Sequence, residues 1–172
     1  MVLALIVPLF AGACGSSSAP KRPATQVVQG PGFRFSAPAS WRVRRTSSSV
    51  AARSPTLATA LVSAAAYRLG RAYTSDRFAE AARELDAVAA KLARAAGGRV
   101  VASETTTAAG RKIRAYRFTL RDDAGRRLVG RVGFVLSGKR EVQLLCQAPA
   151  GAGDPDGGCA LLFESFRLTR GS

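Results

Sequence analysis

The hydrophobic period of the chain changes at Gly97-Gly98, and this change limits the possible folds more than any other feature. Before the two glycines, over residues 75–96, apolar side chains recur every three or four positions, which is typical of an amphipathic α-helix. These side chains are Phe78, Ala82, Leu85, Val88, Ala89 and Leu92. Ser75 is expected to cap the start of this helix, and the glycines are expected to end it. A helix with one apolar face requires a second layer to cover that face.

After the glycines the period is two, which is typical of half-buried β-strands. Residues 99–107 are rich in β-branched side chains, and three later segments place alternate apolar residues on one face. These faces consist of Tyr116, Phe118 and Leu120, then Val132, Phe134 and Leu136, then Val142, Leu144 and Cys146. Turn sequences separate the segments at Ala109-Gly110, at 122–125 and at Ser137-Gly138. The pattern predicts a four-stranded antiparallel meander whose apolar face is covered by the long helix.

Shorter segments flank this unit. Residues 33–35 and 41–43 alternate on either side of Pro38, which predicts two short antiparallel strands. Residues 57–69 are ambiguous because their alanines favour a helix and their Val and Tyr favour a strand; a strand is preferred because the long helix follows directly. Leu162, Phe163 and Phe166 recur at helical spacing and predict a short C-terminal helix. The predicted fold class is α+β: a β-hairpin and a meander in an antiparallel sheet, packed by one long and one short helix.

The first residues of the chain indicate export and lipid attachment. Residues 2–13 are apolar or small, a run too short to span a membrane as a helix but suitable for a signal peptide. Ala11-Gly12-Ala13 precedes Cys14, and a small-residue triplet before a cysteine resembles the lipobox of bacterial lipoproteins. Residues 1–13 are therefore predicted to be a signal peptide, and Cys14 the site of lipid attachment (palmitate) that anchors the protein to the extracytoplasmic face of the cell membrane. The alternatives are a secreted protein with an incidental cysteine, or a buried N-terminal segment.

Residues 14–31 are predicted to be the lipidated cysteine and a flexible linker, because Ser, Pro, Gly and Gln dominate the segment. The folded domain is then expected over residues 32–169. The two remaining cysteines, Cys146 and Cys159, lie on either side of a loop rich in Gly, Pro and Asp. In an oxidising compartment they are predicted to form a disulfide that closes this loop; the alternative is two independent buried thiols. Two cysteines without a histidine do not complete a tetrahedral metal site, so no metal is expected.

The composition argues against several enzyme classes. The chain has no histidine, which excludes Ser-His and Cys-His nucleophile pairs. The acidic clusters, at 122–123 and at 154–156, lie in turns, where Asp caps backbone groups, and Glu80 and Glu84 lie on the polar face of the long helix. Formal charge is +15, with 26 Lys+Arg against 11 Asp+Glu, but these basic residues are scattered along the chain. No specific nucleic-acid partner is therefore predicted, because charge alone gives only weak, salt-dependent binding.

Several short motifs resemble those of actinobacterial lipoproteins of the PsbP-like α/β class, over roughly residues 30–168. They are Phe35-Ser36-Ala37-Pro38 with Trp41, Glu84-Leu85-Asp86, Gly110-Arg111-Lys112, Gln143-Leu144-Leu145-Cys146, and Cys159 before Leu162-Phe163-Glu164-Ser165-Phe166. The resemblance implies an antiparallel sheet flanked by helices, with no catalytic residue or cofactor to carry over. Relatives with this fold serve as protein-binding adaptors, and some are thought to handle cell-envelope lipids.

Three functional hypotheses follow. The first is a non-catalytic binding or adaptor module at the cell envelope, whose partner is an envelope protein. The second is a carrier or sensor of an envelope lipid or other amphiphile, with Trp41, Tyr67, Tyr73 and Tyr116 lining an apolar pocket. The third is a hydrolase that uses Asp or Glu. The first is preferred, because the sequence has a lipobox-like cysteine and no catalytic constellation.

Overall fold

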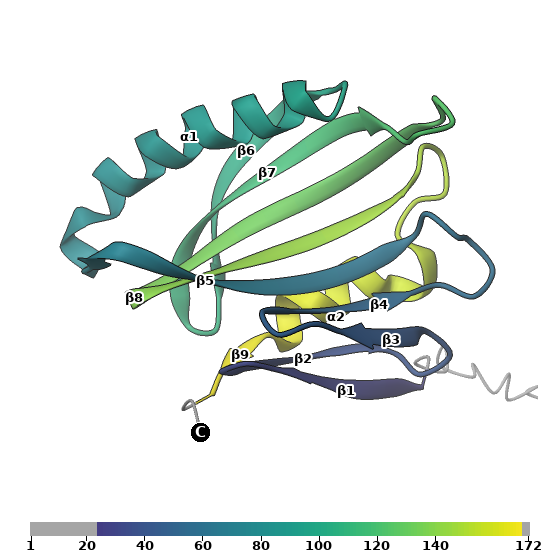
Figure 1. The fold of residues 1–172 in the computed structure, drawn as a ribbon, viewed down its shortest axis with the longest axis horizontal. Helices are drawn as coiled ribbons and strands as arrows, with labels where there is room; N and C mark the ends of the chain where they lie inside the picture. Colours follow the sequence, from purple (N-terminus) through teal and green to yellow (C-terminus); the bar gives the residue numbers. More distant parts are fainter. Residues whose placement is uncertain (1–23, 170–172) are drawn as a thin grey trace, which may run out of the picture.

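The computed structural model describes residues 24–169, and Figure 1 shows their arrangement. The predicted signal peptide, Cys14 and residues 15–23 lie outside the described residues. The strands are β1 (Thr25–Gly30), β2 (Phe33–Pro38), β3 (Arg42–Arg45), β4 (Ser49–Arg53), β5 (Leu61–Tyr73), β6 (Arg99–Ala108), β7 (Arg111–Arg121), β8 (Arg127–Pro149) and β9 (Arg167–Leu168). The α-helices are α1 (Phe78–Ala95) and α2 (Gly158–Ser165), each preceded by a short 3-10 turn, η1 (Ser75–Arg77) and η2 (Pro155–Gly157).

The strands form two antiparallel sheets. The larger sheet has the order β3-β4-β5-β8-β7-β6, and the smaller has the order β1-β2-β9. β8 folds back on itself: the N–H of Ala150 donates to the carbonyl of Arg127 (3.0 Å), and Gly138 has a φ of +57°. The half of β8 before Gly138 pairs with β7, and the half after it pairs with β5. The turn predicted at Ser137-Gly138 is therefore the place where β8 reverses direction, as Figure 1 shows.

The long helix α1 packs on one face of the larger sheet, over β6 and β7 (Figure 1). Leu85 and Ala89 are buried there against Tyr116 and Phe134, whose rings meet edge to face at 5.9 Å. The helical stripe predicted from the sequence is wider than the buried one, because α1 covers only the margin of the sheet. Val88 and Leu92 are left 44% and 53% exposed.

Both ends of α1 are informative. Ser75 does not cap α1, because it lies in η1 and the α-helix begins only at Phe78. The other end is as predicted: the N–H of Gly98 donates to the carbonyl of Ala93 (2.8 Å), and Gly97 has a φ of +66°, which favours glycine. Gly98 is also pressed against β7, since a Cβ at this position would lie 1.7 Å from the carbonyl oxygen of Thr119.

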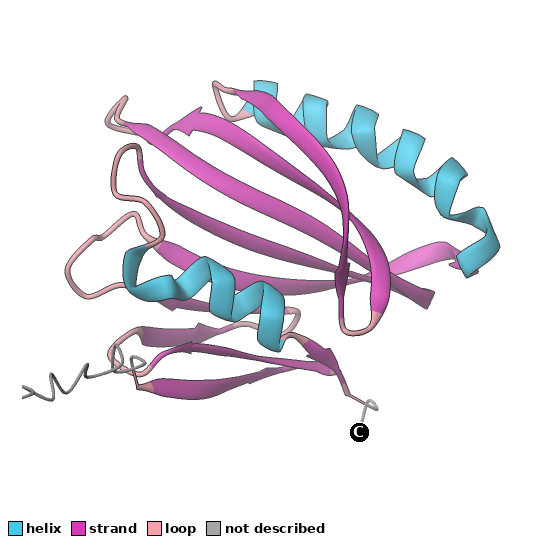
Figure 2. Ribbon diagram, turned by 180° about the vertical axis from the view of Figure 1, so that it is seen from behind, coloured by secondary structure: helices cyan, strands magenta, loops and turns pink. Residues whose placement is uncertain are grey.

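The second helix, α2, packs on the opposite face of the larger sheet and also contacts β2 of the smaller one (Figure 2). The main core lies between these layers, where Phe33 and Phe166 are fully buried with their ring centroids 6.0 Å apart. Leu162 and Phe163 of α2 belong to the same core. The C-terminal helix predicted from their spacing is present, and it ends at Ser165.

Two details of the predicted N-terminal part are wrong. The linker expected over residues 14–31 includes the strand β1. This strand pairs with β2 along its whole length, and the side chain of its residue Val28 is fully buried. The two strands expected to pair with each other belong to different sheets: β2 pairs with β1 and β9, and β3 pairs with β4. The strand preferred for residues 57–69 is present as β5.

The fold class is α+β, with antiparallel sheets and two α-helices, as the sequence predicted. None of the helices in residues 24–169 combines the length and the apolar character required to cross a membrane.

Candidate functional site

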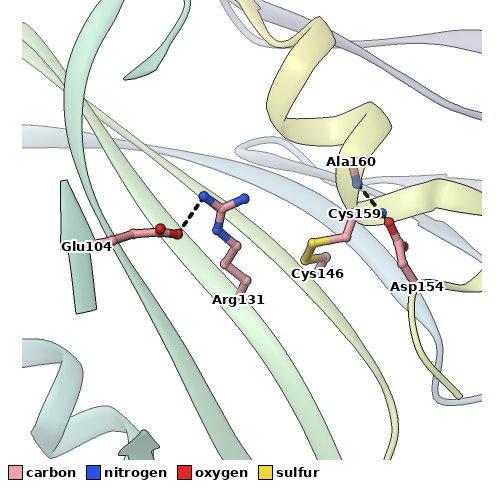
Figure 3. Close-up of a disulfide and its surroundings, with 6 residues drawn as sticks. All are labelled: Glu104, Arg131, Cys146, Asp154, Cys159 and Ala160. Carbon is pink, nitrogen blue, oxygen red and sulfur yellow. Dashed lines mark hydrogen bonds and ion pairs between the residues drawn. A yellow bond between two sulfur atoms is a disulfide. The ribbon is translucent and has the colours of Figure 1, made fainter. Parts of the chain in front are cut away.

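Cys146 of β8 and Cys159 of α2 form a disulfide, shown in Figure 3, with their Cα atoms 5.3 Å apart. The start of α2 is fixed a second time by Asp154, whose two carboxylate oxygens accept the N–H groups of Cys159 (2.7 Å) and Ala160 (3.0 Å). Asp156 in η2 accepts a hydrogen bond from the indole N–H of Trp41 (2.8 Å). The loop before α2 is therefore held by one covalent bond and three hydrogen bonds.

Beside the disulfide lies a half-open groove of about 550 Å³, which we call the α2 groove. It lies on the face of the larger sheet that α2 covers only in part. Its lining residues are Trp41, Leu61, Val62, Val101, Ala102, Arg117, Phe118, Thr119, Val129, Gly130, Arg131, Cys146, Gln147, Ala148, Gly153, Asp154, Pro155 and Cys159. A volume of this size is typical of small-molecule sites.

Two arginines form the polar part of the α2 groove. Arg117 of β7 and Arg131 of β8 are register partners, so they lie directly opposite each other on one face of the sheet. Like charges in this position repel, and such pairs destabilise a sheet unless counter-charges are close. Glu104 of β6 supplies one counter-charge, because it accepts a hydrogen bond from Nη2 of Arg131 at 2.7 Å (Figure 3). Within residues 24–169, the side chain of Arg117 makes no hydrogen bond or ion pair.

The guanidinium of Arg131 is held in place but not fully satisfied. Its central carbon lies 4.1 Å from the ring centroid of Phe163 on α2, a distance typical of a cation–π contact. Its Nε atom is buried and has no hydrogen-bond acceptor within the described part of the chain. A buried donor without an acceptor costs about 1–3 kcal/mol, so the sheet retains an unfavourable polar group at this point.

The apolar part of the groove consists of side chains that a folded domain usually buries. Val101 is 51% exposed and Val129 is 37% exposed, and both line the groove near the arginines. Val101 lies at a register irregularity of β6, between Val100 and Ala102, which places it toward the groove while Val100 packs beneath α1. The groove therefore combines cationic side chains with an exposed aliphatic surface.

The four aromatic residues predicted to line one pocket do not gather. Trp41 borders the α2 groove, whereas Tyr73 lines a separate cleft of about 380 Å³ between α1 and β5. Tyr67 lines a third hollow, near Arg140, and is half exposed. Tyr116 is buried beneath α1. The prediction of a single aromatic pocket is wrong, because these residues lie on different faces and edges of the larger sheet.

Tyr116 is part of a polar cluster that fastens α1 to the sheet. Its hydroxyl donates to Oδ1 of Asp86 (2.7 Å), and Nε of Arg114 donates to the same oxygen (2.9 Å). The hydrogen bond from Arg114 holds the pKa of Asp86 below its usual range, whereas burial raises the pKa of Tyr116 well above its usual range. A neutral tyrosine and an ionised aspartate form a stable pair, and neither group is poised to transfer a proton near neutral pH.

Two other acidic residues, Asp122 and Glu80, also have structural partners. Asp122 accepts the backbone N–H groups of Ala124 (3.1 Å) and Arg126 (2.8 Å) in the turn after β7, and these bonds lower its pKa despite the opposing effect of desolvation. Glu80 pairs with Arg77 at the start of α1. Within residues 24–169, no three His, Cys, Asp or Glu side chains gather where they could hold a metal ion.

Sequence analysis did not identify the arginine pair, Glu104 or the two exposed valines as site residues. The basic residues were interpreted as scattered, because the arginines spread from Arg22 to Arg170 and no run of basic residues is longer than a pair. One signal was available: both arginines fall between the apolar residues of the predicted meander strands and therefore share the opposite face. Their direct opposition depends on the β7–β8 register, which the sequence pattern alone does not fix.

No protein-family model and no curated protein matches this sequence. Similar folds occur among solved structures. One is the cyanobacterial PsbP (CyanoP) from Synechocystis sp. PCC 6803, with a TM-score of 0.58 and 13% identity, over 91% of this chain and 98% of that one. Another is LpqN, involved in cell envelope biogenesis of Mycobacterium tuberculosis, with a TM-score of 0.54 and 13% identity, over 86% of this chain and 91% of that one.

A third is a crystal structure from Bacteroides thetaiotaomicron VPI-5482, with a TM-score of 0.59 and 9% identity over 87% of this chain. This chain matches 49% of the Bacteroides protein, about half its length. At these identities the comparisons establish the fold, which is PsbP-like.

Proposed function

We propose that this chain is a lipid-anchored lipoprotein of the cell envelope that acts as a non-catalytic binding or adaptor module. The observation that carries the proposal is the α2 groove, which offers exposed valines and incompletely paired arginines on a rigid frame of sheet, helix and disulfide. The carboxylate in its lining, Asp154, binds the start of α2, and Glu104, the partner of the lining residue Arg131, is engaged in that ion pair. These contacts support recognition at this site rather than acid–base chemistry.

Three observations support an extracytoplasmic location. Ala11-Gly12-Ala13 before Cys14 fits lipid attachment, and the Cys146–Cys159 disulfide fits an oxidising compartment. The similar fold of LpqN, a protein involved in cell envelope biogenesis, is consistent with the same setting. Stable anchoring by acylation requires more than one membrane-binding element, such as two acyl chains.

The anchoring part of the proposal has a direct test. Cells expressing the wild type or Cys14→Ser are labelled with a fatty-acid analogue and separated into membrane and soluble fractions. We expect a labelled, membrane-bound wild type and an unlabelled, released variant. A wild type that is never labelled, or a variant that stays in the membrane fraction, contradicts lipid attachment at Cys14.

The binding role is tested by photo-crosslinking in intact cells. A photoreactive amino acid is introduced at Val101 in the α2 groove and, as a matched control, at Arg44, which is exposed on β3 of the same sheet. We expect a discrete product of protein size from position 101 and not from position 44. Identical products at both positions contradict a recognition site in the groove. Turnover of an envelope substrate that is stopped by Glu104→Gln contradicts the non-catalytic role.

The alternative function is a carrier or sensor of an envelope lipid or another amphiphile, and the exposed Val101 and Val129 favour it. The same crosslinking distinguishes the two functions, because a lipid adds a small mass to the chain whereas an adaptor partner adds the mass of a protein. Native mass spectrometry of the protein purified from its own envelope is the second readout. A protein that carries no lipid argues against the carrier function.

A further inference from the structure

We propose that the α2 groove binds an amphiphilic anion, whose phosphate or carboxylate group contacts Arg117 and Arg131 and whose apolar part lies along Val101 and Val129. This inference rests on the alternative function stated above, the binding of an amphiphile, because it names the class of amphiphile for the same groove. It assigns the charged end of the ligand to Arg117 of β7 and Arg131 of β8. The apolar end lies along Val101 of β6, Val129 of β8 and the wall near the disulfide.

The charge balance of this face carries the first step. Arg117 and Arg131 are opposite each other, and Arg121 and Arg127 are opposite each other four residues further along the same face of the same strand pair. Glu104 is the acidic side chain that pairs with this row within the described residues. Asp154 lines the same groove, so four guanidinium groups stand against two carboxylates, which leaves an excess of positive charge that an oxyanion neutralises.

The second step concerns the donors that a ligand can use. Arg117 is exposed and makes no side-chain hydrogen bond within residues 24–169, so all its N–H groups are available. Arg131 donates from Nη2 to Glu104 and stacks on Phe163, which fixes the plane of its guanidinium. A planar guanidinium that is already oriented loses little freedom on binding, and its geometry matches phosphate and carboxylate oxygens.

The third step concerns the apolar end. Val101 and Val129 lie within the same groove as the arginines. Cys146 and Ala148, which are largely buried, also line the groove and extend its apolar surface. A free inorganic anion uses only the arginines and leaves both valines exposed to water. An amphiphile covers the valines as well, so the groove matches a ligand that has both parts.

The probes are octyl phosphate and octanoate, with octyl glucoside as the neutral probe and inorganic phosphate as the probe without an alkyl chain. Binding to the full chain carrying Cys14→Ser is measured by calorimetry, at concentrations below micelle formation. Trp41 is the single tryptophan of the chain and borders the groove, so its fluorescence reports occupancy of this site. We expect at least one octyl anion to bind about tenfold or more tightly than octyl glucoside and inorganic phosphate, because charge-assisted hydrogen bonds and apolar contact act together.

Arg117→Gln is the decisive variant, since it removes a charge without removing a contact within the described chain. We expect it to weaken binding of the octyl anions by about tenfold or more and to leave octyl glucoside unaffected. Arg131→Gln is expected to act in the same direction, and Arg44→Gln, which removes an equal charge on β3, is expected to change nothing. If Arg131→Gln does not fold, Arg117→Gln still decides the question.

The outcomes separate this inference from the proposed function. Equal binding of octyl glucoside and the octyl anions overturns the anionic assignment but leaves a groove that binds amphiphiles. Equal binding of inorganic phosphate and octyl phosphate overturns the apolar assignment. If no octyl anion binds, or if Arg44→Gln weakens binding as much as Arg117→Gln, the inference is wrong, while the crosslinking at position 101 still tests the binding module independently.

Discussion

Removal of the Cys146–Cys159 disulfide should lower the free energy of unfolding by about 3 kcal/mol, the value expected for a loop of roughly this size. The two cysteines are separated by 13 positions in the sequence. The crosslink restricts the unfolded chain, so its loss increases the entropy of the unfolded state and favours unfolding. The perturbation is the double variant Cys146→Ala/Cys159→Ala, which leaves no unpaired thiol from this bridge.

The structure indicates that the rest of α2 survives this change. Asp154 still accepts the N–H groups at the start of the helix, and Leu162 and Phe163 still pack in the main core. Small domains typically have a free energy of unfolding of about 5–15 kcal/mol, so a loss of about 3 kcal/mol leaves the protein folded. The loss should therefore appear as a shift of the midpoint of a single unfolding transition, with a denaturant dependence that is equal or steeper because the unfolded chain is less compact.

The assay is urea denaturation of the full chain in a Cys14→Ser background, which removes the third cysteine from every sample. Three samples are compared: the oxidised protein, the same protein with reductant, and the double alanine variant. Reductant and substitution should produce the same shift, because both act by opening the loop. Loss of less than about 1 kcal/mol in the double variant would refute the loop-entropy argument. A shift caused by the substitutions but not by reductant would assign the effect to lost packing of Cys146 instead.

Two further predictions concern α1. Gly98→Ala should lower the free energy of unfolding by about 1–3 kcal/mol, because its Cβ would meet the carbonyl of Thr119 on β7. The control is Gly70→Ala, which should have little effect because the space around Gly70 is open. Thermal unfolding of both variants measures the difference. Asp86 should make stability dependent on acid: its pKa is lowered on folding by Arg114, so its contribution is present above about pH 4 and is lost as pH falls through the folded-state pKa. Asp86→Asn should flatten the decline of stability below about pH 4, by an amount limited to about 1 kcal/mol because the pair is partly exposed; a curve that parallels the wild type contradicts this role.

Local signals in the sequence predicted the elements that have their own period or their own turn. The helix α1 has a three-to-four residue repeat that ends at Gly97-Gly98, and the reversal of β8 has a glycine at position 138. These features depend on backbone conformation over a few residues, so they can be predicted from the local sequence without knowledge of the fold.

The pairing of the N-terminal strands depends on distant residues and could not be predicted in this way. Segment 33–35 has the alternation of a strand, but alternation does not specify a partner. Its partners are β1, which composition assigned to a linker, and β9, from the other end of the chain. Val27-Val28 was the local sign of β1, and it was outweighed by the surrounding Gln, Gly and Pro.

The candidate site depends on how far α2 covers the larger sheet as well as on how the strands pair. Alternation assigned one face of the meander to the core beneath α1 and made the other face a polar surface. The structure shows that α2 covers this other face in part, over β8 and β5, and leaves Arg117 and Val101 exposed. The boundary of that coverage is set by two contacts: the Cys146–Cys159 bridge, which the sequence indicated, and the stacking of Arg131 on Phe163, which it did not. Cys146 and Cys159 both line the groove, so opening the bridge between them should weaken binding of the octyl anions even where the domain remains folded, and calorimetry on Cys146→Ala/Cys159→Ala measures this.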